Sequence, residues 1–326
     1  MDGLYTKIWH KYMKSSLGVL EHSVGIPTPD ASSPIVPDPE AELTLVAWGD
    51  PQISSLSPLR SARLSAACRD IANINGKIDA LMLLGDITEY GRECEYRMAA
   101  DIIGTVSDKF DTFLCVSGNH DVRFRDYSRQ LKKFENFVSK IKGGLISGNG
   151  HYYFSVHIKG YKFIMMGTDS NTLEDAYISD EQLKNLEDDL DEVKDGKPVF
   201  ILNHQTLKGD NGLPITWLGK GDWRGSVGDQ SDKIKEIFDR HKNIVYITGH
   251  LHYGVSRYNF EDHGSYKALS VPTVGVMNHG EYDKDSQGYV LSVYKDRIIG
   301  RARSFGEGKY VDSSIEGAEF EIKLEK

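Results

Sequence analysis

The stretch LTLVAWGDPQ, residues 43–52, contains an apolar run that ends abruptly at Gly49 and Asp50. A short continuous apolar run of this kind is typical of a strand that is buried on both faces. A buried strand that ends on a carboxylate needs an explanation, because it is costly to remove an unpaired charge from water. Other apolar runs of the chain end in a similar way.

Four further apolar runs are followed directly by a few kinds of polar residue. LMLL precedes Gly85-Asp86, and FLCVS precedes the sequence Gly-Asn-His-Asp at 118–121. VFIL precedes Asn203-His204, and VYIT precedes Gly-His-Leu-His at 249–252. Ligands of open α/β sheets bind at the carboxyl ends of the strands. Five such ends therefore predict one convergent cluster of carboxylate, amide and imidazole groups.

The rest of the chain alternates predicted strands with predicted helices. Hydrophobic periodicity predicts helices over 59–73, 94–106, 128–141, 179–193 and 231–241, and strands over 43–48, 79–84, 111–117, 198–203 and 243–249. A hairpin is expected over 151–167, and strand-like stretches follow at 265–278, 288–305 and 319–326. Alternating strands and helices followed by mostly strands predict a layered α/β sandwich with central sheets.

Residues 1–41 differ from the rest of the chain. Leu4, Ile8, Met13 and Leu17 have the spacing of a short amphipathic helix, and prolines at 27, 29, 34, 37 and 39 disfavour regular structure after it. We therefore expect an N-terminal helix and Pro-rich extension over 1–41, and one domain over 42–326.

The composition limits the class of protein. The 326 residues are 39% hydrophobic and 27% charged, as in an ordinary globular protein, and the formal net charge of −9 makes long nucleic acid an improbable partner. The three cysteines form no CxxC pattern, which favours a reducing compartment. No apolar run has the length of a signal peptide core or a membrane span. We expect a cytoplasmic protein without a membrane partner; no feature of the sequence indicates its oligomeric state.

Each motif also has a plain structural interpretation. A single Gly-Asp after a strand is usually a turn, and a single histidine there is more often a structural group than a ligand. The sequences GNHD and GHLH are more specific, because several metal-binding side chains share one turn and no packing requirement explains them. All five motifs together are difficult to explain as independent turns.

The blocks GDPQ, GDITEYG, GNHD, NHQ and GHLH, in this order, resemble the signature motifs of the calcineurin-like metallophosphoesterases. The resemblance extends from about residue 43 to the C-terminal strands and does not cover residues 1–41. It implies an α/β fold, the four-layer α/β/β/α sandwich with two central mixed sheets and with two metal ions at the strand ends.

The resemblance also implies roles for individual residues. The ligands of the first metal would be Asp50, Gln52, Asp86 and His252, and those of the second would be Asn119, His204 and His250, with Asp86 as the bridge. His120 would be the catalytic histidine outside the metal ligands, and Asp121 the acid that orients it. Gln52 departs from the family, because most relatives have histidine there.

These donors suit two divalent metal ions, with Mn²⁺ favoured and Fe or Zn²⁺ as alternatives. Two such ions can bind a phosphoryl oxygen and deprotonate a bridging water for in-line attack, while His120 assists the leaving group. Two dications balanced by Asp50, Asp86 and one hydroxide leave about one positive charge. The expected activity is therefore hydrolysis of a small phosphate ester, either a diester or a monoester.

Further substrate contacts and a second class of function remain open. Arg123 and Asn171 are candidate substrate-binding residues, and the glycine-rich loop 207–230, with Trp217 and Trp223, is expected to line the site. Alternatively, the protein is a metal-weakened binding or regulatory relative that hydrolyses little, with Gln52 as the defect. The presence of every other expected ligand favours the enzyme.

Overall fold

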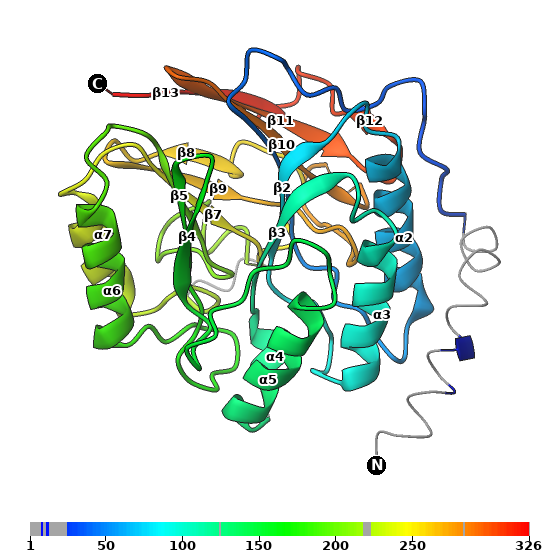
Figure 1. Ribbon diagram of the computed structural model, residues 1–326, viewed down its shortest axis with the longest axis horizontal. Helices are drawn as coiled ribbons and strands as arrows, with labels where there is room; N and C mark the ends of the chain where they lie inside the picture. Colours follow the sequence, from blue (N-terminus) through cyan, green and yellow to red (C-terminus); the bar gives the residue numbers. More distant parts are fainter. Residues whose placement is uncertain are drawn as a thin grey trace.

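The computed structural model describes residues 8, 11–12, 25–123, 125–217, 223–282 and 284–325. In this part of the chain, two β-sheets pack face to face and helices cover their outer faces (Figure 1). Both sheets contain parallel and antiparallel strand pairs. This architecture confirms the predicted four-layer α/β/β/α sandwich with two central mixed sheets.

The first sheet has the strand order β12-β11-β10-β1-β2-β3, and β13 also pairs with β11. Its strands are β1 (Leu43–Trp48), β2 (Ile78–Leu84), β3 (Phe110–Val116), β10 (Gln287–Val293), β11 (Arg297–Ser304), β12 (Lys309–Tyr310) and β13 (Glu319–Lys323). Strand β1 is parallel to β2 and antiparallel to β10. Because β1 lies in the interior of this sheet, all six of its residues are buried.

The second sheet has the order β4-β5-β6-β7-β9-β8. Its strands are β4 (Phe154–Ile158), β5 (Tyr161–Met165), β6 (Val199–Leu202), β7 (Ile244–Thr248), β8 (Phe260–Asp262) and β9 (Tyr266–Ser270). Strands β4 and β5 form the predicted hairpin, and β5, β6, β7 and β9 are parallel. The stretch 265–278 is a strand only as far as Ser270, since Pro272 has no N–H to continue the ladder.

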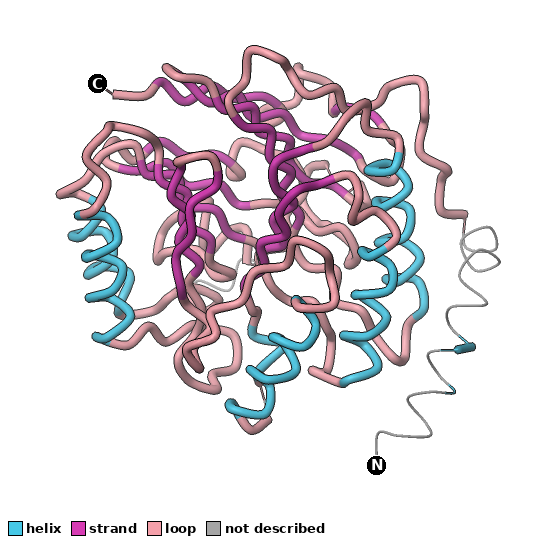
Figure 2. Tube along the Cα trace, viewed as in Figure 1, coloured by secondary structure: helices cyan, strands magenta, loops and turns pink. Residues whose placement is uncertain are grey.

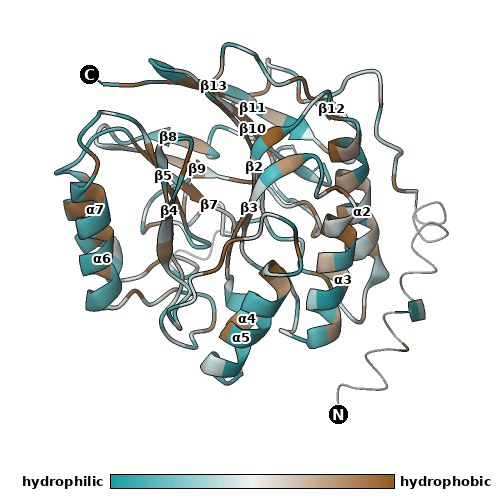
Figure 3. Cartoon of the chain, in the orientation of Figure 1, coloured by the Kyte–Doolittle hydropathy of each residue, from teal (hydrophilic) through white to brown (hydrophobic). Residues whose placement is uncertain are grey.

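The helices lie in two groups outside the sheets (Figure 2). They are α2 (Pro58–Ala72), α3 (Glu93–Gly104), α4 (Asn119–Val122), α5 (Tyr127–Val138), α6 (Asp180–Asp191) and α7 (Gln230–Phe238). Helices α2, α3 and α5 pack on the first sheet, and α6 and α7 pack on the second. Both groups show apolar and polar faces (Figure 3). A third apolar cluster, which includes the stacked rings of Phe163 and Phe200, fills the space between the sheets.

The segment before β1 packs on the domain from Pro29 onward. The side chain of Ile35 is fully buried, and its carbonyl accepts the N–H of Asn75 at 3.0 Å. Arg303 donates to the carbonyl of Ser33 at 2.8 Å. The helix expected near residues 4–17 lies outside the described residues, apart from positions 8, 11 and 12. Within the described residues, every helix is too short or too polar to cross a bilayer.

Candidate metal centre

The polar residues predicted to converge do so at the carboxyl ends of parallel strands from both sheets. Asp50 and Gln52 follow β1, Asp86 follows β2, Asn119 begins α4 after β3, His204 follows β6, and His250 and His252 follow β7. Six of these seven residues are at most 2% exposed, and the side chain of His252 is 21% exposed. Loops that are distant in the sequence thus create one buried polar cluster between the two sheets.

The backbone of this cluster is strained. Asp50, Gln52, Asp86, His250 and His252 have φ angles of +46°, +38°, +47°, +72° and +52°, in the left-handed region that side chains other than glycine rarely adopt. Strain of this kind persists where the surrounding structure enforces it, and it is frequent at functional sites. The described residues contain nine non-glycine positions of positive φ, and five of them lie in this cluster.

Two glycines allow the strand ends to approach one another. A Cβ atom on Gly118 would lie 2.1 Å from Oδ1 of Asp86, and one on Gly249 would lie 2.6 Å from Oδ2 of Asp50. Both distances are shorter than any real contact, and the atoms that would be met belong to expected ligands. Glycine before these motifs is therefore a packing requirement of the cluster.

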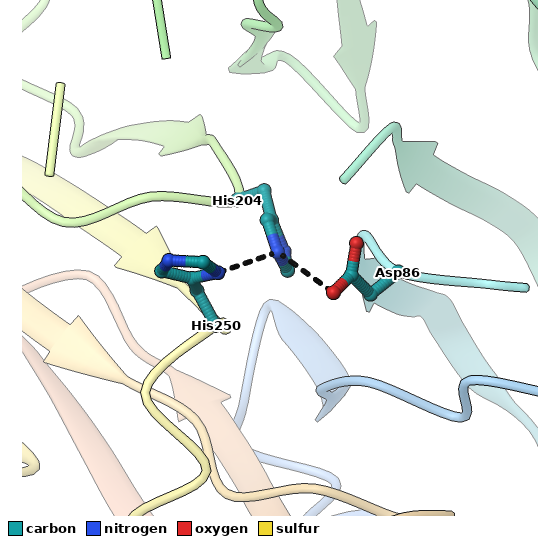
Figure 4. A group of neighbouring side chains, drawn as sticks. All are labelled: Asp86, His204 and His250. Atoms are coloured by element: carbon teal, nitrogen blue, oxygen red, sulfur yellow. Dashed lines mark hydrogen bonds and ion pairs between the residues drawn. The ribbon is translucent and has the colours of Figure 1, made fainter. Parts of the chain in front are cut away.

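One group of candidate ligands contains Asp86, His204 and His250 (Figure 4). Nδ1 of His204 lies 2.6 Å from the carbonyl of Leu84, which fixes the ring and turns Nε2 toward the cluster. That Nε2 atom lies 3.1 Å from Nδ1 of His250 and 3.4 Å from Oδ2 of Asp86. Oδ1 of Asn119 is 3.2 Å from the same nitrogen, so the four side chains predicted for the second metal lie together.

A second group contains Asp50, Asp86 and His252. Nε2 of His252 lies 3.1 Å from Oδ1 of Asp50, whose Oδ2 accepts the backbone N–H of His250 at 2.9 Å. The side-chain amide of Gln52 donates to Oδ2 of Asp86 at 3.1 Å. In each group the possible ligand atoms lie within 4.8 Å of one another, and Asp86 belongs to both groups.

Mutual charges shift the pKa values of this cluster. Burial opposes ionisation of Asp86, but the charges of His204 and His120 outweigh it and hold the pKa of Asp86 far below its usual range. Burial likewise disfavours protonation of His204, yet Asp86 and Asp50 raise the pKa of His204 to about 9. Burial and the charge of His204 hold the pKa of His250 well below its usual value. These pKa shifts keep Asp86 ionised beside a protonated His204 and a neutral His250.

The donor set fits two cations that share one carboxylate. Asp50 and Asp86 are buried. Among the described residues, the side chains that form hydrogen bonds or ion pairs with them are histidines and Gln52 rather than lysine or arginine. Nε2 of His250 is buried and has no hydrogen-bond partner among the described residues. Carboxylate oxygens, an amide oxygen and imidazole nitrogens are ligands of Mn²⁺, Fe and Zn²⁺. A cation would replace the proton that His204 otherwise carries.

His120 lies at the edge of the cluster. Its backbone N–H donates to Oδ1 of Asp86 at 2.8 Å, and Nε2 of its ring lies 3.9 Å from Oδ2 of the same residue. Nδ1 is occupied on the opposite side, 2.7 Å from Nη2 of Arg123 and 3.1 Å from the carbonyl of Glu89. Nε2 is therefore the ring nitrogen that faces Asp86 and the cluster.

Asp121 contacts the backbone around His120 rather than its ring. The Asp121 carboxylate accepts the N–H groups of Gly118, Ile87 and Thr88 at 3.0–3.1 Å, and the Thr88 hydroxyl at 2.8 Å. The family resemblance predicts that Asp121 orients the imidazole of His120. The structure instead places Glu89, which was not singled out in the sequence, beside that ring, with Oε2 3.6 Å from Nδ1.

The two candidate substrate residues have different surroundings. Arg123 contacts His120 and also donates to Oε1 of Glu174 at 3.2 Å. Asn171 is exposed and donates to the carbonyl of Arg125. Among the described residues, no recorded hydrogen bond or ion pair joins Asn171 to an expected metal ligand.

Part of the loop 207–230 covers His250, in the group formed by Asp86, His204 and His250. The ring of Trp217 stacks on His250 with 4.5 Å between centroids and 21° between planes. A Cβ atom on Gly225 would lie 2.9 Å from Nε2 of His250. These contacts confirm that the loop lines the site, while the side chain of Trp223 is 43% exposed.

Comparison with solved structures supports the fold. The fold is similar to that of a dimetal phosphatase from Danio rerio, with a TM-score of 0.55 and 14% identity over 87% of this chain and 100% of that one. It is also similar to a purple acid phosphatase from yellow lupin seeds, with a TM-score of 0.57 and 14% identity over 86% of this chain and 53% of that one. At such low identity, these matches show a common fold.

A curated relative and a family model extend the comparison to the sequence. A probable glycerophosphodiester phosphodiesterase from Arcobacter nitrofigilis is 26% identical over 185 residues, which is 56% of this chain and 59% of that protein. The chain thus spans about three fifths of the length of this relative. The family model described as calcineurin-like phosphoesterase matches residues 44–254, the segment that contains all five motifs, and the chain therefore belongs to the calcineurin-like phosphoesterase family.

Proposed function

We propose that this protein hydrolyses a small phosphate ester with the help of two divalent metal ions. The observation that carries the proposal is the position of Asp86, which belongs to both groups of candidate ligands. A carboxylate has two oxygens and a negative charge, so it can join two cations. The family and the named activity of the curated relative support phosphoester hydrolysis as the reaction.

The expected ligands divide unequally between the two ions. The first ion would be held by Asp50, Gln52, Asp86 and His252. The second would be held by Asn119, His204, His250 and the shared Asp86. Oxygen donors predominate in the first set, which favours Mn²⁺ there over softer ions. When bound, the two ions supply positive charge for the phosphoryl oxygens and an activated water.

The residues of the chain complete the reaction. Attack by water forms one phosphorus–oxygen bond while the bond to the ester oxygen breaks, so the leaving oxygen needs a proton or a hydrogen bond. Nε2 of His120 faces the centre and can supply it, because an N–H donated by Arg123 to Nδ1 leaves the ring proton on Nε2. We assign Asp121 a positioning role, since it holds the backbone of the loops that carry Asp86 and His120.

Turnover of bis(4-nitrophenyl) phosphate by the demetallated protein, before and after addition of Mn²⁺, tests the proposal. We expect negligible turnover without metal, activity when Mn²⁺ is restored, and loss of activity when a chelator is added. Equal turnover by the exhaustively demetallated protein would contradict the proposal. Tight metal binding without turnover of aryl or alkyl phosphate esters would favour the binding or regulatory relative instead.

A further inference from the structure

Two arginines reach the residues of the metal centre. Nη1 of Arg60 donates to the backbone carbonyl of Gln52 at 3.1 Å. Nη2 of Arg123 lies 2.7 Å from Nδ1 of His120. Arginines in such positions often bind the phosphoryl group of a substrate, because the guanidinium fork matches phosphate oxygens.

Both arginines are already paired with glutamates of this chain. Arg60 forms an ion pair with Glu89, whose side chain is 15% exposed. Arg123 pairs with Glu174 at 3.2 Å between Nη1 and Oε1. The other carboxylate oxygen of Glu174 accepts the side-chain N–H of Asn119 at 2.9 Å, which fixes Glu174 beside an expected metal ligand. These two pairs therefore add two positive and two negative charges beside the centre, with a sum close to zero.

This balance leaves the charge of the centre to the metal ions and their ligands. Two dications with Asp50, Asp86 and one hydroxide sum to about one positive charge. A phosphodiester carries one negative charge and matches this sum. A phosphomonoester carries nearly two negative charges above its second pKa of about 6. Its additional negative charge would gain little from the two arginines, because each is already paired with a glutamate.

From these pairs we infer that the protein discriminates by charge and prefers phosphodiesters to phosphomonoesters, with Glu89 and Glu174 as the residues that set this preference. The inference rests on the proposed phosphoesterase function and specifies its substrate class. Glu174 is the better residue to test, because Glu89 also approaches the ring of His120, at 3.6 Å between Oε2 and Nδ1.

The substrates for the test are 4-nitrophenyl phosphate and its methyl ester, which share one leaving group and differ by one charge at about pH 8. Glu174→Gln keeps the shape of the side chain and an oxygen for Asn119 but removes the carboxylate charge that pairs with Arg123. We expect the ratio of kcat/KM for the diester to that for the monoester to fall about tenfold or more in this variant. The two esters differ in intrinsic reactivity, but this difference cancels when the ratio for the variant is compared with the ratio for the native protein.

Glu187→Gln is the matched control. Glu187 lies on α6, is 42% exposed at its side chain and also pairs with an arginine, Arg240, at 2.5 Å. This substitution removes the same charge from a glutamate–arginine pair on a helix that packs on the outer face of the second sheet. We expect it to leave the ratio unchanged.

Binding provides a readout that does not need turnover. Calorimetry on the Mn²⁺-loaded protein, above the second pKa of the phosphonate, would compare methylphosphonate as a dianion with its monomethyl ester as a monoanion. We expect the native protein to favour the monoanion and Glu174→Gln to shift the preference toward the dianion. An unchanged preference in folded Glu174→Gln, or tighter binding of the dianion by the native protein, would overturn the inference. If neither ester is hydrolysed the proposed function fails, and the binding comparison still decides the charge preference.

Discussion

Gln52 donates a side-chain N–H to Oδ2 of Asp86 across 3.1 Å, so a neutral amide lies beside the carboxylate that both ligand groups share. Because the nitrogen of this amide faces Asp86, its oxygen remains as a donor for the first metal. An amide oxygen is a weaker ligand than an imidazole nitrogen, so the first site has one strong ligand fewer than a histidine would provide. We therefore expect the second metal to bind more tightly than the first.

Gln52→His should raise the metal affinity of the first site and shift its preference from Mn²⁺ toward Zn²⁺ or Fe. The φ angle of +38° at this position does not oppose the change, since histidine is enriched among residues of positive φ. Competition titrations of both proteins with a chromogenic chelator measure the two affinities. Two equally tight sites in the native protein, unaltered in the variant, would leave the asymmetry without support.

His120→Ala should retain most of the metal and slow hydrolysis of an alkyl phosphodiester by about 10²–10⁴-fold, because its Nε2 assists the leaving oxygen. The loss should shrink with a 4-nitrophenyl leaving group, which needs little protonation. Steady-state rates across a series of leaving groups show this dependence. A variant that hydrolyses the alkyl ester as fast as the native protein would refute the role of His120.

Trp217→Ala should weaken metal binding at the second site by about 10–100-fold, as with other residues that fix a ligand without touching the metal. The Trp217 ring covers His250 at 4.5 Å between centroids, and its removal frees the imidazole to rotate. The dissociation rate of the tighter metal measures the effect. Trp223→Ala, a more exposed tryptophan of the same loop, is the control and should leave that rate unaltered.

Asp70→Asn should destabilise the fold by about 3–5 kcal/mol, because it leaves the buried guanidinium of Arg303 without its counter-charge. Arg303 donates to both carboxylate oxygens of Asp70, at 2.6 and 2.7 Å, and both side chains are fully buried. The same arginine holds the carbonyl of Ser33, so the pair also fixes the Pro-rich segment that precedes β1.

Urea denaturation provides the free energy of unfolding for Asp70→Asn. The control is Asp296→Asn, which breaks the ion pair between Asp296 and Arg297. Both side chains are exposed, by 67% for Asp296 and 38% for Arg297. Exposed pairs contribute about 0–1 kcal/mol, so this variant should be nearly as stable as the native protein. Equal destabilisation by the two substitutions would show that the buried pair has no special role.

The sequence indicates the expected metal ligands because each one follows closely after an apolar run. Asp50 and Asp86 are visible as charges at the ends of buried strands, where packing alone would favour apolar residues. The position of Asp121 is partly predictable too: an acidic residue at the third position of a helix often accepts the N–H at the helix start, as Asp121 does with Gly118.

Other contacts depend on which loops meet in space. Glu174 lies more than fifty residues from Asn119, and no local pattern indicates that its carboxylate meets the amide of that residue. The stacking of Trp217 on His250 likewise depends on the path of a long loop. Glu89 lies within the motif GDITEYG, so the sequence indicates a charged residue near the site. The sequence does not indicate its neighbour, because the ring of His120 follows a different strand.

The shared role of Asp86 is the central claim, and metal analysis of Asp86→Asn tests it most directly. We expect about two Mn²⁺ per chain in the native protein and loss of both, together with hydrolysis, in the variant, because the bridge loses its charge. Asp111→Asn, at an exposed aspartate of β3 that pairs with Lys77, should behave as the native protein does. Retention of two metals and of the native rate by Asp86→Asn would contradict a dinuclear centre built on this carboxylate.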